Sequence, residues 1–387
     1  MLKIALWGST LSKIIALAFL FLYVAPIMIF TIDYPFQVFQ FVLISSFFVI
    51  GLLAPATRLR HMPYIDYTDR FRVTPMAVYL IFLIYVTSNF GVILDMFNSI
   101  VSNNFISFVY QNAVDRYESF ETVSNYTILQ RISVIGFLMS GSLVASVSDK
   151  RIQVHILLFI MIFIESLQLA RFGVLFVFVT YFVEYVIRNN RSLQLLKFWS
   201  LLKTGLYATS CLIAIFWFSA YFRIAGRVDD VSAVLIIKFA QYTIAMHEAL
   251  LIWMASNSDS YATYFGSNSF AGVFKIFGFH TDQGFYKLTE TSFGATNIYT
   301  TIRGLLSDFG VVGTSSILFF SGFTIYKYSK VNMTFISYNL VRLIITMILF
   351  CLISPMNYFN CVAASIGSGV IIAGFNFGKK NTKILSS

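Results

Sequence analysis

Arginines beside apolar runs are the residues of this chain best suited to bind a substrate. They are Arg171, Arg223, Arg227 and Arg303. A guanidinium donates five hydrogen bonds in a planar fork, which fits the oxygens of a phosphate or diphosphate. The alternative for each is an arginine that reaches the membrane surface along its apolar stem, or one that pairs with an acid such as Asp229. As a set, the four arginines predict recognition of a phosphorylated ligand.

Three side chains are candidates for a general base. Asp308 and Glu290 lie in a polar segment, 290–310, and either carboxylate could accept the proton of an acceptor hydroxyl. The alternative for Asp308 is a structural carboxylate before the next helix, where the macrodipole favours negative charge. His280 is the third candidate, and a histidine in a surface loop is its alternative. His247 is the other histidine of the predicted external regions.

Segment 290–310 separates its polar and apolar residues when it is drawn as a helix from Thr296. Two neighbouring stripes carry hydroxyls, an amide, a guanidinium and a carboxylate, whereas the opposite stripe is apolar. The stripes are Thr296, Thr300, Arg303 and Ser307; Asn297, Thr301, Gly304 and Asp308; and Ile298, Ile302, Leu305 and Phe309. The pattern predicts an amphipathic helix at a membrane surface, either with a polar site on one side or as a simple cap on a helical bundle.

The composition is that of an α-helical membrane protein. The chain is 58% apolar, 18% aromatic and only 11% charged, with a mean hydropathy of +0.78. The net charge of +10 does not indicate nucleic-acid binding, because the positive residues lie in short loops between apolar runs. Cys211, Cys351 and Cys361 lie inside such runs, which predicts no disulfide framework. No metal-ligand spacing is present, so we expect no required metal and no cofactor.

Ten apolar runs approach the length of roughly 20 residues that crosses a bilayer. They cover about 13–31, 36–54, 75–94, 128–148, 152–169, 172–187, 204–222, 310–327, 336–354 and 359–377. With both termini in the cytoplasm, the loops on that side hold 17 of the 27 Lys and Arg and 3 of the 17 acids. The external loops hold 8 basic residues and 12 acids. This positive-inside bias predicts one all-α polytopic membrane domain, 1–387, with a large external loop subdomain at 223–309.

One segment of that loop, Val231–Met254, is nearly apolar enough to be an eleventh span. Lys238, Gln241 and Glu248 fall on one helical face of it, however. A polar stripe on an apolar helix is typical of a helix that lies in the membrane interface. We therefore expect this segment to lie at the external surface.

Motifs in segment 290–310 resemble those of the Wzy-type O-antigen polymerases of bacteria, which join oligosaccharide repeat units. The motifs are the run from Gly294 to Thr300, then Arg303, then Ser307-Asp-Phe-Gly310 leading into a span, with Gln168-Leu-Ala-Arg-Phe-Gly173 as further support. Together they cover about a tenth of the chain. Some members carry a Gly eleven residues after an external Arg, whereas Phe182 and Thr314 occupy those positions here.

The resemblance implies a glycosyltransferase of the bacterial inner membrane with its site at the periplasmic face. It would move a growing glycan from one undecaprenyl-diphosphate carrier to the non-reducing end of a repeat unit on another. The four arginines, Asn297 and Tyr299 would then bind substrate, and a chain-length regulator would be a possible partner. A ligase with a lipid A–core acceptor is the alternative. A flippase or transporter fits less well, because it would need charges deep in several spans and helices broken at mid-membrane.

The chain carries none of the common sequence signatures of soluble enzymes. The chain has no P-loop, no His-Glu-x-x-His, no Gly-x-Ser-x-Gly and no dinucleotide fingerprint. A donor sugar would therefore reach the site already attached to a lipid.

Overall fold

The structure is a computed structural model whose described residues are almost all helical. They are 10–53, 73–102, 104, 107–108, 128–147, 152–167, 171–188, 217, 221, 231–256, 266, 269–276, 289–296, 300–330, 335–350 and 359–384. These ranges contain no β-strand and only two isolated bridges, Val73–Val147 and Thr289–Thr296.

Several of the described helices are long and apolar enough to cross a bilayer. Four single helices meet this condition: Pro35–Leu53, Ile128–Ala145, Ser232–Ser256 and Thr301–Tyr328. Shorter apolar helices are Ser12–Met28, Ile152–Ser166, Ile336–Phe350 and Asn360–Ile372. A helix occupies each predicted span position except 204–222, nearly all of which lies outside the described residues. The chain is thus a helical membrane protein, as its composition predicts.

The third predicted span, 75–94, is not continuous. It is divided into α4 (Pro75–Ser88) and α5 (Phe90–Val101), which are bent by 67° at Asn89. The Asn89 side chain donates a hydrogen bond from Nδ2 to the Tyr85 carbonyl at 2.9 Å. Such a local bond competes with the regular backbone pattern, so the helix ends here instead of at residue 94.

The chain packs as two compact units, which are described separately. Unit 1 comprises Met1–Tyr67, Asn189–Gln194 and Phe239–Val362. Its helices are α1 (Thr10–Phe19), the π-helical turn η1 (Leu20–Val24), α2 (Ala25–Met28), α3 (Pro35–Leu53), η3 (Gln241–Ala245), α13 (Met246–Ser256), α14 (Ala271–Ile276), α15 (Thr301–Lys330) and α16 (Phe335–Phe350).

In unit 1, α3 and α15 form an extensive helix–helix contact. Two glycines allow it. A Cβ atom at Gly51 would overlap the Phe319 carbonyl oxygen, and one at Gly322 would overlap the Phe48 carbonyl oxygen. Because backbone lies directly against backbone, neither position has space for a side chain.

Unit 2 comprises Thr68–Arg188, Leu195–Lys238 and Ala363–Ser387. It holds α4, α5, α7 (Ile128–Ala145), α8 (Ile152–Leu167), α9 (Arg171–Arg188), most of α12 (Val231–Ala240) and most of α17 (Phe359–Ile384). Here α7 packs closely on α4 and α9. Gly141 on α7 lies against the Val177 carbonyl of α9, a second approach that excludes a side chain.

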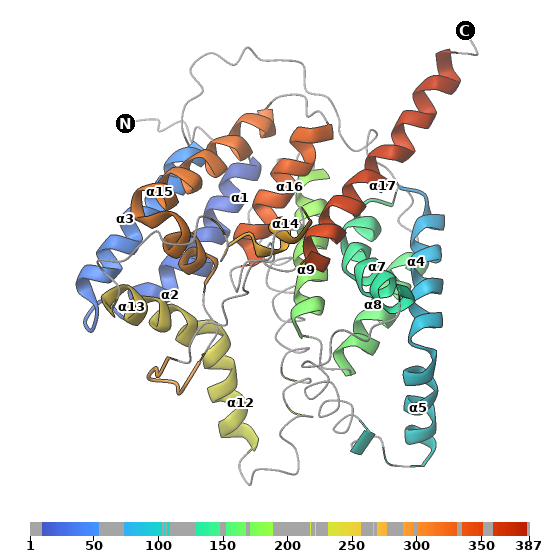
Figure 1. The fold of residues 1–387 in the computed structure, drawn as a ribbon, viewed down its shortest axis with the longest axis horizontal. Coiled ribbons are helices and arrows are strands. Elements are labelled where there is room, and N and C mark those ends of the chain that lie inside the picture. The colour runs from blue at the N-terminus through green and yellow to red at the C-terminus, as the bar shows by residue number, and fades with distance from the viewer. Residues whose placement is uncertain are drawn as a thin grey trace, which may run out of the picture. The chain divides into compact units, whose positions relative to one another are not determined.

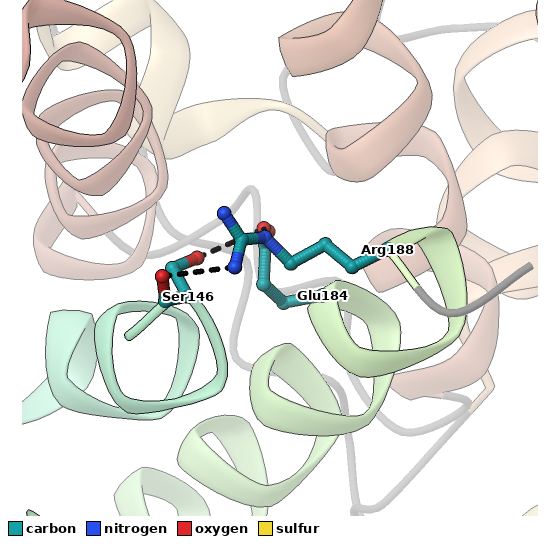
Figure 2. A network of polar contacts seen from close by, with 3 residues as sticks. All are labelled: Ser146, Glu184 and Arg188. Carbon is teal, nitrogen blue, oxygen red and sulfur yellow. Dashed lines mark hydrogen bonds and ion pairs between the residues drawn. The ribbon is translucent and has the colours of Figure 1, made fainter. Parts of the chain in front are cut away.

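A buried polar cluster joins three chain segments at one end of unit 2 (Figure 2). Arg188, the last residue of α9, pairs with Glu184 one turn earlier at 3.1 Å and donates to the Ser146 carbonyl at 2.8 Å. Ser146 donates from its hydroxyl to Glu184 at 2.9 Å, and its carbonyl also accepts the Val73 N–H at 3.0 Å. The start of α4 and the ends of α7 and α9 therefore meet at the same end. This arrangement agrees with the prediction that the three adjoining loops share one side of the membrane.

Candidate functional site

The segment that carries the family-like motif begins as a tight hairpin. Thr289 and Thr296 exchange two backbone hydrogen bonds, each 2.9 Å long. Between them, the Thr291 hydroxyl donates to the Gly294 carbonyl at 2.7 Å. Gly294 has φ of 94°, a left-handed conformation that favours glycine. The predicted helix from Thr296 is therefore wrong at its start: Thr296 is extended, and α15 begins only at Thr301.

This hairpin, residues 289–296, is attached to the helical segment formed by η3 and α13. Both carboxylate oxygens of Glu248 accept the Ser292 N–H at 3.0 Å, and the Ser292 hydroxyl donates to Glu248 at 2.6 Å. Seven residues earlier, Gln241 donates from Nε2 to the Phe293 carbonyl at 3.0 Å. Glu248 and Gln241 are thus buried against the hairpin. Their polar face serves a contact within the protein, and the prediction that it faces the membrane interface is wrong for these two residues.

The first part of α15 is enclosed on every side. All residues from Thr300 to Asp308 are buried, including Arg303 and Ser307. The prediction of an amphipathic helix with one side at the membrane surface is therefore wrong for this stretch. At Gly310 the backbone leaves helical geometry, with φ of 64° and ψ of −174°, and the longer apolar part of α15 follows. The break coincides with the predicted start of the eighth span.

Arg303 lies against the aromatic ring of Trp253 on α13. Its guanidinium carbon is 5.2 Å from the ring centroid, a distance at which the ring attracts a cation. Arg303 also lies in the first turn of α15, where the positive end of the macrodipole disfavours a cation and favours an anion. The neighbouring Thr300 is buried, and its hydroxyl has no hydrogen-bond partner among the residues that the structure describes. The guanidinium and the helix terminus therefore both favour a negatively charged ligand here.

Asp308 holds the turn that precedes α14. Its Oδ2 accepts the Ser269 N–H at 2.7 Å, and the adjoining rings of Phe270 and Phe309 are 6.3 Å apart. Asp308 is 3% exposed, so its carboxylate is committed to this protein contact. Asp308 thus has a structural contact, which is a hydrogen bond to another segment and not the macrodipole interaction of the alternative.

Unit 1 places this site near the turn between α2 and α3. In Figure 1, α13 runs across the ends of these two helices. Burial raises the pKa of Tyr34 in that turn, and the nearby carboxylate of Glu248 raises it further. By the predicted topology this turn is external, which is the side expected for the site.

His247 joins α13 to the first helix. In a regular helix the N–H of residue 26 would bond the Leu22 carbonyl, but residue 26 is proline and has no N–H. His247 Nε2 lies 3.0 Å from that carbonyl oxygen and is placed to donate to it. His247 is fully buried, so this histidine of the predicted external regions does not face solvent. Its role is structural.

The other predicted site residues are placed less completely. Glu290 lies on the hairpin and is exposed, without a described contact to Arg303. Arg171 begins α9 in unit 2, and its side chain is outside what the structure describes. Also outside the described residues are Arg223, Arg227, His280, Asn297 and Tyr299. Of the predicted residues, Arg303 and Asp308 both lie on the buried start of α15.

Sequence reasoning missed the contacts that hold these residues. Glu248, Trp253 and Ser269 are separated from their partners by tens of residues, so no local spacing could reveal the pairs. The signal available was the pair Gln241 and Glu248, two polar residues seven apart in an apolar segment. That spacing places them on one face but does not identify what covers it.

Among the described residues, no group of three or more His, Cys, Asp or Glu side chains could hold a metal ion. No family model, curated protein sequence or solved structure matches this chain.

Proposed function

We propose that this protein is a polymerase of lipid-linked oligosaccharide repeat units, acting at the outer face of the bacterial inner membrane. The growing glycan would leave one undecaprenyl-diphosphate carrier and join the non-reducing end of a repeat unit on a second carrier. The motif resemblance supports the family, and the helices suit an enzyme whose substrates are anchored in the bilayer.

The observation that carries the proposal is the position of Arg303. This arginine lies inside the motif-bearing segment, in the first turn of a buried helix. In the proposed reaction, the bond between the glycan C1 and the carrier phosphate oxygen breaks, and a bond from C1 to the acceptor oxygen forms. The carrier diphosphate leaves with an additional negative charge. A fixed guanidinium and a helix N-terminus stabilise such a charge without a metal ion.

The acceptor hydroxyl must lose its proton in the same reaction. One carboxylate oxygen of Asp308 already accepts the Ser269 N–H, so Asp308 suits this role less well. Glu290 is exposed on the hairpin that leads into α15, so a substrate can reach its carboxylate. We assign it as the better of the two carboxylate candidates for the general base.

Deletion of the gene tests the function. A polymerase mutant should retain surface glycan with one repeat unit on its anchor, because synthesis and export of the unit do not need polymerisation. Gel electrophoresis of the surface glycan would show a single band in place of a ladder. Loss of all glycan, including the single unit, would instead identify a ligase or a flippase.

A further inference from the structure

The hairpin 289–296 is fixed to the same helix that holds Arg303. Glu248 contacts Ser292 near the start of α13, and Trp253 contacts Arg303 five residues later on that helix. Only three residues separate the end of the hairpin from Thr300, which precedes α15. One helical segment therefore contacts both the hairpin and Arg303.

The Glu248 carboxylate is buried and hydrogen-bonded to the hairpin. The carboxylate is 4% exposed, and two donors of Ser292, the N–H shared between both carboxylate oxygens and the hydroxyl, replace part of its lost hydration. A buried carboxylate without such donors would be very unfavourable, so the hairpin and the helix stabilise each other. Gln241 adds a second attachment through the Phe293 carbonyl. The close fit at Gly294 leaves only 3.0 Å between a Cβ atom there and Gln241 Nε2.

We propose that Glu248 is a positioning residue, which sets the place of the buried start of α15 and hence of Arg303 by fixing the hairpin. Gln241 assists it from one side. Glu248 itself does not contact the substrate. The effect on glycan synthesis rests on the proposed function, whereas the effect on the position of α15 does not.

Cysteine labelling tests the positional part. Thr300 is 1% exposed, so a cysteine at this position in the purified full-length protein should react slowly with a charged maleimide. The native Cys211, Cys351 and Cys361 are first replaced by alanine. In Glu248→Ala, labelling of residue 300 should accelerate by about tenfold to a hundredfold, because hydrogen bonds to a charged group are lost. Glu248→Gln keeps one acceptor oxygen and should give an intermediate rate.

Asp95→Asn is the matched control, since Asp95 is an exposed carboxylate on α5. It should leave the labelling rate unchanged. Equal rates in Glu248→Ala, Glu248→Gln and the parent protein would overturn the proposal. If Glu248→Ala does not accumulate in the membrane, the comparison of Glu248→Gln with the parent decides the question alone.

The glycan ladder then separates the two proposals. Faster labelling together with a shorter ladder at normal membrane level would support both. Faster labelling with a full-length ladder would show that Glu248 fixes the position of α15 but that this region does not serve glycan transfer. That result would refute the proposed function of Arg303. A shorter ladder without faster labelling would overturn the positioning role and leave the proposed function standing.

Discussion

Arg303 combines features that a purely structural arginine does not need. It is buried in the first turn of α15, where the backbone amides disfavour a cation, and it is held by an aromatic ring. An arginine that served only to reach the membrane surface would keep its guanidinium in water. At the residue scale, this position fits the negatively charged ligand of the proposed function.

The role of the planar fork at Arg303 can be tested by substitution. Arg303→Lys keeps the charge but loses bidentate recognition, so it should fail nearly as badly as Arg303→Ala. Each should slow polymerisation by roughly 10²–10³ in rate and reduce the ladder to one or two repeats. Arg131→Lys, at an exposed position on α7, is the control. Long chains from both Arg303 variants at normal expression would show that this arginine only anchors its helix.

Asp308 differs from Arg303, because its carboxylate already accepts a hydrogen bond from the Ser269 N–H. Asp308→Asn retains an oxygen that can accept the Ser269 N–H, so the protein should accumulate normally and form a full ladder. Asp308→Ala leaves that buried donor unsatisfied and should cost about 1–3 kcal/mol of stability. Membrane level and ladder length together measure the difference. A stable Asp308→Asn protein without polymerisation would return Asp308 to the role of general base.

At the scale of elements, α3 supports α15 through contacts between backbones. Gly51 and Gly322 each face a carbonyl oxygen of the other helix. Arg303 and Asp308 lie near the start of α15, and the later part of the same helix makes this contact. The break at Gly310 separates the two functions of α15. The buried start holds the candidate site residues Arg303 and Asp308, and the apolar remainder packs on α3.

Alanine at Gly51 or Gly322 should therefore destabilise unit 1. The added methyl group meets rigid backbone, and such overpacking costs about 1–3 kcal/mol, so the melting temperature in detergent should fall. Gly91 on α5 provides the control, because a methyl group added there would meet no neighbouring atom within 4 Å. Gly91→Ala should be neutral or slightly stabilising, because alanine favours helix. An unchanged melting temperature in the Gly51 and Gly322 variants would contradict the close helix contact.

At the scale of the whole molecule, the arrangement of unit 2 bears on topology. Ser146 and Arg188 meet in one polar cluster (Figure 2), and the Val73 N–H donates to the Ser146 carbonyl. Each of the three residues adjoins a loop that the charge distribution assigns to the cytoplasm. The site of unit 1 lies at the turn between α2 and α3, which the same distribution assigns to the outside.

Reporter fusions test this assignment. Fusions after residues 60, 195 and 385 should report the cytoplasm, and fusions within 100–120 and 255–285 should report the outside. The physical reason is the positive-inside bias of the loops. An external signal from the fusion after residue 385 would mean that Ser232–Ser256 crosses the bilayer, since this helix is long and apolar enough to do so.

The amino-acid sequence was sufficient to predict a helical membrane protein and the positions of most of its helices. Apolar runs of sufficient length must form helices in lipid, because every backbone polar group has to be bonded internally. Local pattern also singled out Arg303 and placed the start of a span at residue 310. The fold was needed to show that the start of α15 is buried on all sides, that Asp308 holds Ser269, and that Gln241 and Glu248 face the hairpin. Helical periodicity shows which residues share a face, but what covers that face depends on contacts between residues far apart in the chain.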